Sequence, residues 1–216
     1  MEISEADGSK YKLTATKGTL VLTITDNSGL TANDPDWVTI GTQKWARKNL
    51  NVGVMIDGSQ YQTNNSLVEK NCYDNLESNC TKYGGLYQWR EMMAYVPDTE
   101  AEGTRGVCPV GSHVPTELEW KALFTYLGGI EIAGMKLSSS GGVGFDMMFG
   151  GMRFAGAGGF HEKDTYAYNW SSSHIVGVPW NSWQFGNYYS GQGAGTNLTE
   201  FAYDKSFALS VRCLKD

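Results

Sequence analysis

The stretch Pro115-Thr-Glu-Leu-Glu-Trp-Lys-Ala-Leu-Phe-Thr-Tyr-Leu-Gly-Gly129 decides the fold, because it contains the clearest helix in the chain. Thr116 and Glu119 have the spacing of a capping box, in which each side chain accepts a hydrogen bond from the other residue's backbone N–H. Apolar residues then recur at helical spacing, at Trp120, Leu123, Phe124 and Leu127. The pair Gly128-Gly129 is typical of a helix end, so we expect a helix between Thr116 and these glycines.

Weaker patterns surround this helix. Residues 81–94 place apolar side chains near helical spacing and predict a second helix. The segment from Trp37 to Trp45 predicts two strands around a glycine turn. Further short strands are predicted in four segments after Gly129, at residues 145–154, 166–171, 180–185 and 206–214. Two helices among short, irregular antiparallel strands indicate an α+β fold.

The first residues of the chain differ from the rest. The segments Tyr11–Thr16 and Thr19–Thr25 are rich in β-branched residues and flank Lys17-Gly18, which predicts a β-hairpin. We therefore divide the chain into an N-terminal β extension, residues 1–36, and one domain, residues 37–216.

Composition excludes several classes of function. The chain has 216 residues, a net charge of −6 and only 17 Lys and Arg. Nucleic-acid binding needs clustered cations, and none are clustered here. No segment approaches the roughly 20 apolar residues of a membrane helix, so membrane insertion is not expected. The start Met1-Glu2-Ile3-Ser4 has neither the basic start nor the apolar run of a signal peptide.

The four cysteines are Cys72, Cys80, Cys108 and Cys213, and four cysteines allow three pairings. Cys72 and Cys80 lie close together in a turn-like segment, so we pair them, which leaves Cys108 with Cys213. The alternative is four free thiols in a reducing compartment. An even number of cysteines with polar flanks favours an oxidising compartment, and hence a secreted or cell-surface protein. Zinc is not expected, because no pair of cysteines has C-x-x-C spacing.

Several motifs in register carry a family resemblance. They are Gly41-Thr-Gln-Lys-Trp45 with Asn49-Leu-Asn51, Cys72-Tyr-Asp-Asn-Leu-Glu-Ser-Asn-Cys80, Tyr83-Gly-Gly-Leu-Tyr-Gln-Trp89, Gly106-Val-Cys-Pro-Val-Gly-Ser-His113, Pro115-Thr-Glu-Leu-Glu-Trp120, Trp170-Ser-Ser-Ser173 and Ser210-Val-Arg-Cys213. Over residues 37–216 the chain resembles the Fibrobacter succinogenes major paralogous domain family. The resemblance implies a C-type-lectin-like fold, shared with formylglycine-generating enzymes, in surface or secreted proteins of unknown function.

A second resemblance concerns the C-terminal part, from Trp170 to Cys213. This part is similar to the variable region of proteins diversified by retroelements, in which randomised adenines turn Asn codons into codons for other residues. Residues 175–178, 188–191 and 193–196 draw mostly on the residue types that this process produces. Trp183, Gln184 and Glu200 depart from the pattern, because a randomised AAC codon cannot encode them.

Composition alone also predicts a binding surface in this part. Rings interleaved with small polar residues resemble the composition of antibody paratopes. The expected ligand-binding residues are His174, Ile175, Val176, Val178, Asn181, Trp183, Asn187, Tyr188, Tyr189, Ser190, Thr196, Leu198, Phe201 and Tyr203. Among the rings, we expect Trp180 and Phe185 in the core, and Tyr188, Tyr189 and Trp183 exposed. The ligand is a protein or a glycan, and the function is receptor-like or adhesin-like, without catalysis or a cofactor.

Two other functions stay open. In a carbohydrate-binding surface protein, Trp and Tyr rings would stack on sugars. A degenerate enzyme of the formylglycine-generating type is disfavoured, because only Cys213 lies where that class has a cysteine pair. Arg153 is expected to pair with a carboxylate, and His113 and the segment 161–164 are read as structural.

Calcium is the only metal that the sequence suggests. Oxygen ligands between the first two cysteines could hold Ca²⁺, and they belong to Asp74, Asn75, Glu77 and Asn79. The favoured alternative is a solvated turn closed by a disulfide.

Overall fold

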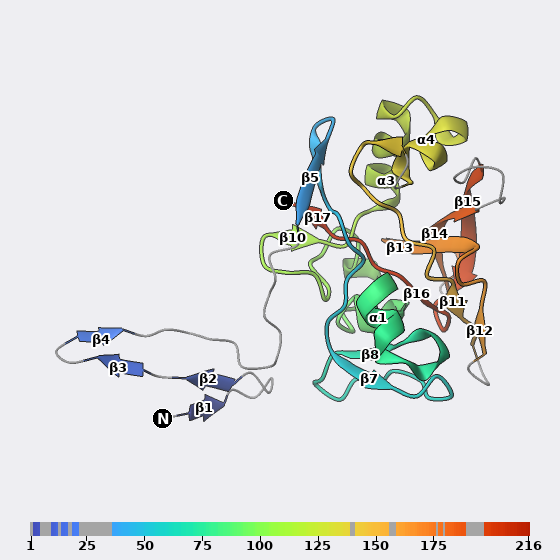
Figure 1. Cartoon of the computed structure of the whole chain (residues 1–216). Coiled ribbons are helices and arrows are strands. Elements are labelled where there is room, and N and C mark those ends of the chain that lie inside the picture. Colours follow the sequence, from blue (N-terminus) through green and yellow to red (C-terminus); the bar gives the residue numbers. More distant parts are fainter. Residues whose placement is uncertain are drawn as a thin grey trace.

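The computed structural model describes residues 36–138, 141–155, 159–175, 177, 178, 180–188 and 197–216, together with the backbone of four N-terminal strands (Figure 1). Those strands are β1 (Glu2–Ser4), β2 (Lys10–Lys12), β3 (Thr14–Thr16) and β4 (Thr19–Val21). β1 pairs with β2, and β3 pairs with β4, both antiparallel. The β3–β4 pair confirms the predicted N-terminal hairpin, whose turn residues 17 and 18 lie outside the described residues.

Helix α3 (Glu117–Tyr126) begins at the predicted capping box. Glu119 N donates to Thr116 Oγ1 at 3.2 Å, and Thr116 N donates to Glu119 Oε2 at 2.8 Å. Gly128 and Gly129 end the helix, each with a φ of 103°. A second helix, α4 (Ile130–Leu137), follows at once. Helix α4 was not predicted from the sequence, because the glycine pair reorients the chain between two helices instead of beginning a loop.

The helix predicted over residues 81–94 is wrong. The segment contains the end of α1 (Glu77–Tyr83), strand β9 (Tyr87–Gln88) and the one-turn helix α2 (Trp89–Met92). Gly84 breaks the helix with a φ of 88°, and a Cβ there would lie 2.5 Å from Asn49 Cβ. Close approach of the two segments thus requires glycine at this position. Two 3₁₀ turns complete the region, η1 (Tyr73–Asn75) and η2 (Asp98–Glu100).

The remaining strands form small sheets (Figure 1). One has the order β10-β17-β6-β5 and another the order β12-β11-β16-β9. Their strands are β5 (Trp37–Ile40), β6 (Gln43–Ala46), β10 (Ser112–His113), β11 (Met152–Arg153), β12 (Phe160–His161), β16 (Ala208–Leu209) and β17 (Leu214–Lys215). β7 (Val54–Ile56) pairs parallel to β8 (Glu69–Asn71). β5 and β6 confirm the predicted strand pair, whereas the strand predicted over 145–154 shrinks to β11.

A three-stranded antiparallel sheet contains β13 (Tyr166–His174), β14 (Asn181–Tyr188) and β15 (Asn197–Asp204) in that order. These are the longest strands of the chain, and they confirm the predicted strands near 166–171 and 180–185. Helices α3 and α4 lie beside this sheet in Figure 1. Helices next to small antiparallel sheets confirm the α+β class.

Aromatic rings form the core between α3 and the sheet. The Trp120 ring lies 4.6 Å from that of Trp45 and 5.6 Å from that of Phe185, measured between ring centroids. A second cluster contains Trp89 and Trp170. Their indole N–H groups donate to Ser171 O at 2.9 Å and to Tyr87 O at 2.8 Å, so no indole donor in this cluster is left without a partner.

Both predicted disulfides are present. Cys72 bonds to Cys80, and Cys108 bonds to Cys213, 105 residues further along the chain. The second disulfide attaches the loop before α3 to the segment that leads into β17, which constrains a long segment of the unfolded chain. Among the described helices, none has both the length and the apolar character needed to cross a bilayer.

Candidate ligand-binding surface

The two faces of the β13–β14–β15 sheet have different surroundings. On one face, Phe185 is fully buried against Trp120 and Phe124 of α3. Asn187 is also fully buried and donates from Nδ2 to Gly134 O of α4 at 2.9 Å. The part of this face around Phe185 and Asn187 is therefore core and is closed to a ligand.

Rings line the other side of the sheet, and we name Tyr166, Tyr168, Phe201, Tyr203 and Phe207 the aromatic face. The rings of Tyr166 and Tyr168 stack at 5.4 Å between centroids, and those of Tyr203 and Phe207 at 5.2 Å. Tyr203 also lies 5.9 Å from Tyr168 and 6.2 Å from Phe201. The rings thus form one continuous row across the sheet.

Gly186 makes this row possible. It pairs with Tyr168 on β13 and with Thr199 on β15. A Cβ at residue 186 would lie 3.2 Å from the Tyr168 ring, which is tighter than an ordinary van der Waals contact. Because glycine has no side chain, the Tyr168 ring covers β14 and reaches Tyr203 of β15.

The rings differ in their exposure. Tyr168 is 3% exposed, and its hydroxyl donates to Glu162 Oε2 at 2.6 Å. Burial, followed by this hydrogen bond, raises the pKa of Tyr168. Phe201 is 43% exposed, and Tyr203 is half-buried. Tyr168 is therefore the buried part of the row, whereas the rings of Phe201 and Tyr203 are partly exposed to solvent.

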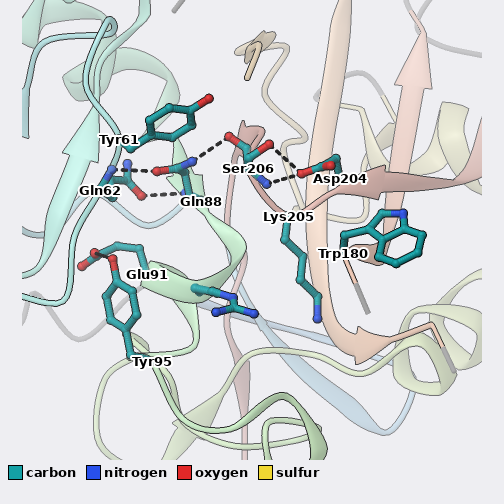
Figure 2. Close-up of a pocket in the computed structure, with 10 residues that line it drawn as sticks. Tyr61, Gln62, Gln88, Glu91, Tyr95, Trp180, Asp204, Lys205 and Ser206 are labelled. Atoms are coloured by element: carbon teal, nitrogen blue, oxygen red, sulfur yellow. Dashed lines mark hydrogen bonds between the residues drawn. The ribbon is translucent and has the colours of Figure 1, made fainter. Parts of the chain in front are cut away.

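A groove of about 270 Å³ lies beside the aromatic face, where β15 ends (Figure 2). Its lining includes Tyr61, Gln88, Arg90, Trp180, Asp204 and Ser206. Tyr61 and Trp180 are 47% and 61% exposed. Figure 2 shows these two rings at opposite ends of the groove, with polar side chains between them.

Amide hydrogen bonds fix the floor of the groove. Gln62 N donates to Gln88 Oε1 at 2.7 Å, and Gln88 N donates to Gln62 Oε1 at 2.6 Å. Gln88 Nε2 donates to Ser206 O at 2.7 Å. These bonds connect the loop at residue 62, strand β9 and the turn after β15, so three segments distant in sequence form one preorganised floor.

Lys205 attaches the same turn to α2. Its Nζ lies 2.7 Å from Asp98 Oδ2 and 3.9 Å from the centroid of the Trp89 ring. Its backbone N donates to Trp180 O at 2.8 Å. Since the side chain of Lys205 is only 5% exposed, the ammonium stabilises the groove wall and is not presented to a ligand.

Glu91 is a buried acid beside the groove. It is 2% exposed, and its two oxygens accept from Glu69 N at 2.9 Å and from the Tyr95 hydroxyl at 3.0 Å. Burial raises the pKa of Glu91 to about 7, because the two hydrogen bonds compensate only part of the lost hydration.

The structure separates the predicted ligand-binding residues into several groups. Phe201 is exposed, and six others are half-buried: His174, Ile175, Val178, Asn181, Trp183 and Tyr203. Asn187 and Leu198 are 0% and 4% exposed, so these two assignments are wrong for a surface contact. Tyr188 lies in β14, but its side chain is outside the described residues, as are Val176, Tyr189, Ser190 and Thr196.

One of the two rings expected in the core is exposed. Phe185 is buried as predicted, whereas Trp180 is 61% exposed. Trp180 immediately precedes the first residue of β14, and its ring lines the groove instead. Trp183 is half-buried, and Lys121 Nζ lies 5.9 Å from its ring centroid.

The sequence suggested a carboxylate partner for Arg153, but its partners among the described residues are backbone carbonyls. It is fully buried and donates to Gly58 O at 2.6 Å and Gln60 O at 3.0 Å. Its Cζ also lies 5.1 Å from the centroid of the Tyr61 ring. Arg153 therefore holds the loop that carries Tyr61, which is a structural role in the groove.

His113 lies between two carboxylates, outside the groove. Its Nε2 is 3.0 Å from Glu119 Oε1, and its Nδ1 is 2.7 Å from Asp216 Oδ1. The hydrogen bond with Glu119, offset in part by burial and supported by Asp216, raises the pKa of His113 to about 8.

The oxygens between Cys72 and Cys80 do not converge on one point. Asn75 Oδ1 accepts from Gly58 N at 2.7 Å, Glu77 lies 2.8 Å from Lys70 Nζ, and Asp74 lies 3.7 Å from Lys163 Nζ. Within the described residues, Cys72, Glu77 and Cys80 are the only group close enough to hold a metal, and the two sulfurs are bonded to each other. This geometry does not fit a calcium site.

Four residues line the groove that were not predicted from the sequence: Tyr61, Gln88, Arg90 and Asp204. They lie in segments up to 143 positions apart, and no spacing rule connects them. The available local signal was Asp204 two residues before Ser206, which is typical of a side-chain-capped turn. Ser206 N donates to Asp204 Oδ1 at 2.8 Å, in agreement with that signal.

Together, the fold and this surface define a disulfide-linked α+β domain with an aromatic face and an adjoining groove. The Fibrobacter succinogenes major domain matches residues 38–215. The chain therefore belongs to this family, in agreement with the resemblance of its motifs. No curated protein and no solved structure matches the chain, so the C-type-lectin-like fold stays a prediction.

Proposed function

We propose that the chain is a non-enzymatic ligand-binding module, receptor-like or adhesin-like, which acts at the cell surface or after secretion. It binds a protein or glycan through the aromatic face and the residues next to it. The observation that carries this proposal is the row of stacked rings that ends in exposed Phe201. Large rings fixed by their neighbours bury much area on binding and lose little conformational entropy.

The disulfides support both the location and the absence of catalysis. Disulfides persist in oxidising compartments, which favours a protein outside the cytosol. Since Cys72, Cys80, Cys108 and Cys213 are all bonded, no thiolate is available for the oxygen chemistry of formylglycine-generating enzymes.

Two of the three positions that cannot be randomised, Gln184 and Glu200, fit the likeness to diversified proteins, whereas Trp183 departs from it. Gln184 is fully buried, and Glu200 lies 3.1 Å from Lys121 Nζ. Both residues therefore belong to the scaffold, whereas exposed Phe201 is a neighbour that could vary. The genomic test is a near-copy of this coding segment that differs only at adenines, beside a reverse transcriptase gene.

The binding test begins with arrays of extracellular proteins and of glycans, probed with the full chain. Phe201→Ala should weaken binding to the recovered ligand at least tenfold and change the melting temperature by only a few degrees, because the ring is 43% exposed. The matched control is Leu118→Ala on α3, where the side chain is 72% exposed and lies away from the aromatic face. Equal affinity of both variants would show that the aromatic face is not the site.

A further inference from the structure

We propose that the groove between Tyr61 and Trp180 binds a short, neutral oligosaccharide. This inference rests on the proposed binding function and makes it specific, since it names the ligand class and the exact place. It is carried by the groove's two exposed rings, its fixed polar floor, its size and its charge.

The rings at the two ends provide stacking surfaces. Trp180 is 61% exposed and Tyr61 is 47% exposed, although both are large rings that folding usually buries. Both are held in place. The Lys205 N–H donates to Trp180 O at 2.8 Å, and the Arg153 guanidinium lies 5.1 Å from the Tyr61 ring centroid. The C–H groups on one side of a pyranose ring are apolar and weakly positive, so they complement the negative face of an aromatic ring.

Polar groups between the rings match hydroxyl groups. Asp204 Oδ1 accepts from the backbone N and the hydroxyl of Ser206, at 2.8 Å and 2.6 Å. This arrangement orients the carboxylate and leaves Oδ2 without a partner among the described residues. The side chain of Arg90 is 64% exposed, and its ion pair within the described part of the chain is a 3.6 Å contact with Asp98. A carboxylate oxygen and a guanidinium fork can accept from and donate to neighbouring hydroxyls of one sugar.

The size of the groove limits the ligand. A volume of about 270 Å³ lies just below the usual range of small-molecule sites, roughly 300–1,000 Å³. One or two sugar rings fit such a space. The hydrogen-bonded amides of Gln62 and Gln88 form the floor, so its shape is fixed before a ligand binds.

The charge of the groove favours a neutral ligand. Lys205 is neutralised by Asp98 at 2.7 Å, so Arg90 is the one exposed cation among the described groove residues. Asp204 opposes it, and the whole chain carries a net charge of −6. The Asp204 carboxylate would repel a phosphate or sulfate group on a ligand. It would accept a hydrogen bond from an uncharged hydroxyl.

The test is a titration of the full chain, labelled with ¹⁵N, with neutral gluco-, xylo-, manno- and chito-oligosaccharides at millimolar concentrations. The indole N–H signal of Trp180, assigned by its loss in Trp180→Phe, should shift in a saturable way with at least one of them. Trp180→Ala should weaken that binding at least tenfold. Asp204→Asn, which retains the Oδ1 acceptor for Ser206, should weaken it by roughly tenfold.

Leu118→Ala is again the control and should bind like the unmodified chain. A sulfated oligosaccharide of equal length should bind more weakly than the neutral one. No saturable shift with any neutral sugar, or full affinity in Trp180→Ala, would overturn the assignment of the groove. If no neutral sugar binds but a protein ligand depends on Phe201, the assignment of the groove fails and the proposed binding function still stands.

Discussion

Replacement of His113 by Gln should remove a pH-dependent part of the stability of the domain. Both ring nitrogens of His113 lie within 3.0 Å of carboxylate oxygens, from Glu119 and Asp216. Each nitrogen therefore has to donate, and only the imidazolium form carries two N–H groups. The neutral ring loses one of the two ion-paired hydrogen bonds.

The size of the effect follows from the pKa of His113, which is raised from 6.5 to about 8 in the folded protein. A pKa raised by folding stabilises the protein at low pH. The contribution is complete below pH 6.5 and is lost as the pH rises through 8. The shift corresponds to about 2 kcal/mol at most. Since the Asp216 side chain is 60% exposed, solvent screening reduces this to about 1–2 kcal/mol.

The assay is urea unfolding at pH 6 and pH 9, with the chain and the His113→Gln variant side by side. Between pH 6 and pH 9, the free energy of unfolding should fall by about 1–2 kcal/mol more in the unmodified chain than in the variant. His161→Gln, which changes an exposed histidine of β12, serves as the control. Its unfolding free energy should change with pH as that of the unmodified chain does. Identical pH dependence of the chain and His113→Gln would refute the ion-pair argument.

Other predictions concern stability and follow from buried groups. Burial raises the pKa of Glu91 to about 7, so the unfolding free energy should fall by up to about 3 kcal/mol between pH 5 and pH 8, and Glu91→Gln should abolish this part of the fall in urea titrations. A chain with both Cys108→Ser and Cys213→Ser should lose about 4–5 kcal/mol in the same assay, since the disulfide spans 105 residues; a loss below 1 kcal/mol would contradict this. Arg153→Met should lower the unfolding free energy by about 1–3 kcal/mol, because the buried Gly58 carbonyl loses its donor, and an unchanged melting curve would contradict that role.

Local features of the fold could be predicted from the sequence. Helix α3 was predicted because its capping box lies within four consecutive residues, Thr116 to Glu119. The pairing of Cys72 with Cys80 was also predicted from proximity along the chain. In both cases, the determining interaction connects residues that are close in sequence, so tertiary packing does not override it.

Features that depend on tertiary packing were not predicted. The segment 81–94 has a helical apolar pattern, but its aromatic residues are buried by β9 pairing with β16, which lies about 120 residues further along the chain. Trp180 was expected in the core because of its size, whereas it precedes β14 and its exposed ring lines the groove. The carbonyl partners of Arg153 belong to a loop more than 90 residues earlier in the chain. The residue type alone therefore suggested a carboxylate partner, which was wrong.

The candidate site was predicted only in part. The sequence predicted a binding surface in the C-terminal part, and Phe201 and Tyr203 of that prediction form part of the aromatic face. It did not predict the buried positions of Asn187 and Leu198, because strand alternation depends on which face α4 covers. The groove was missed entirely, since it forms only when the loop at residue 62, β9 and the turn after β15 come together.

A footprint of the ligand on the backbone amides tests the binding role most directly. Hydrogen exchange of the full chain, with and without a ligand recovered from the arrays, should show new protection in residues 197–206 and around Trp180. Protection confined to α3, α4 or the β5–β6 strands, with these segments unchanged, would contradict the account.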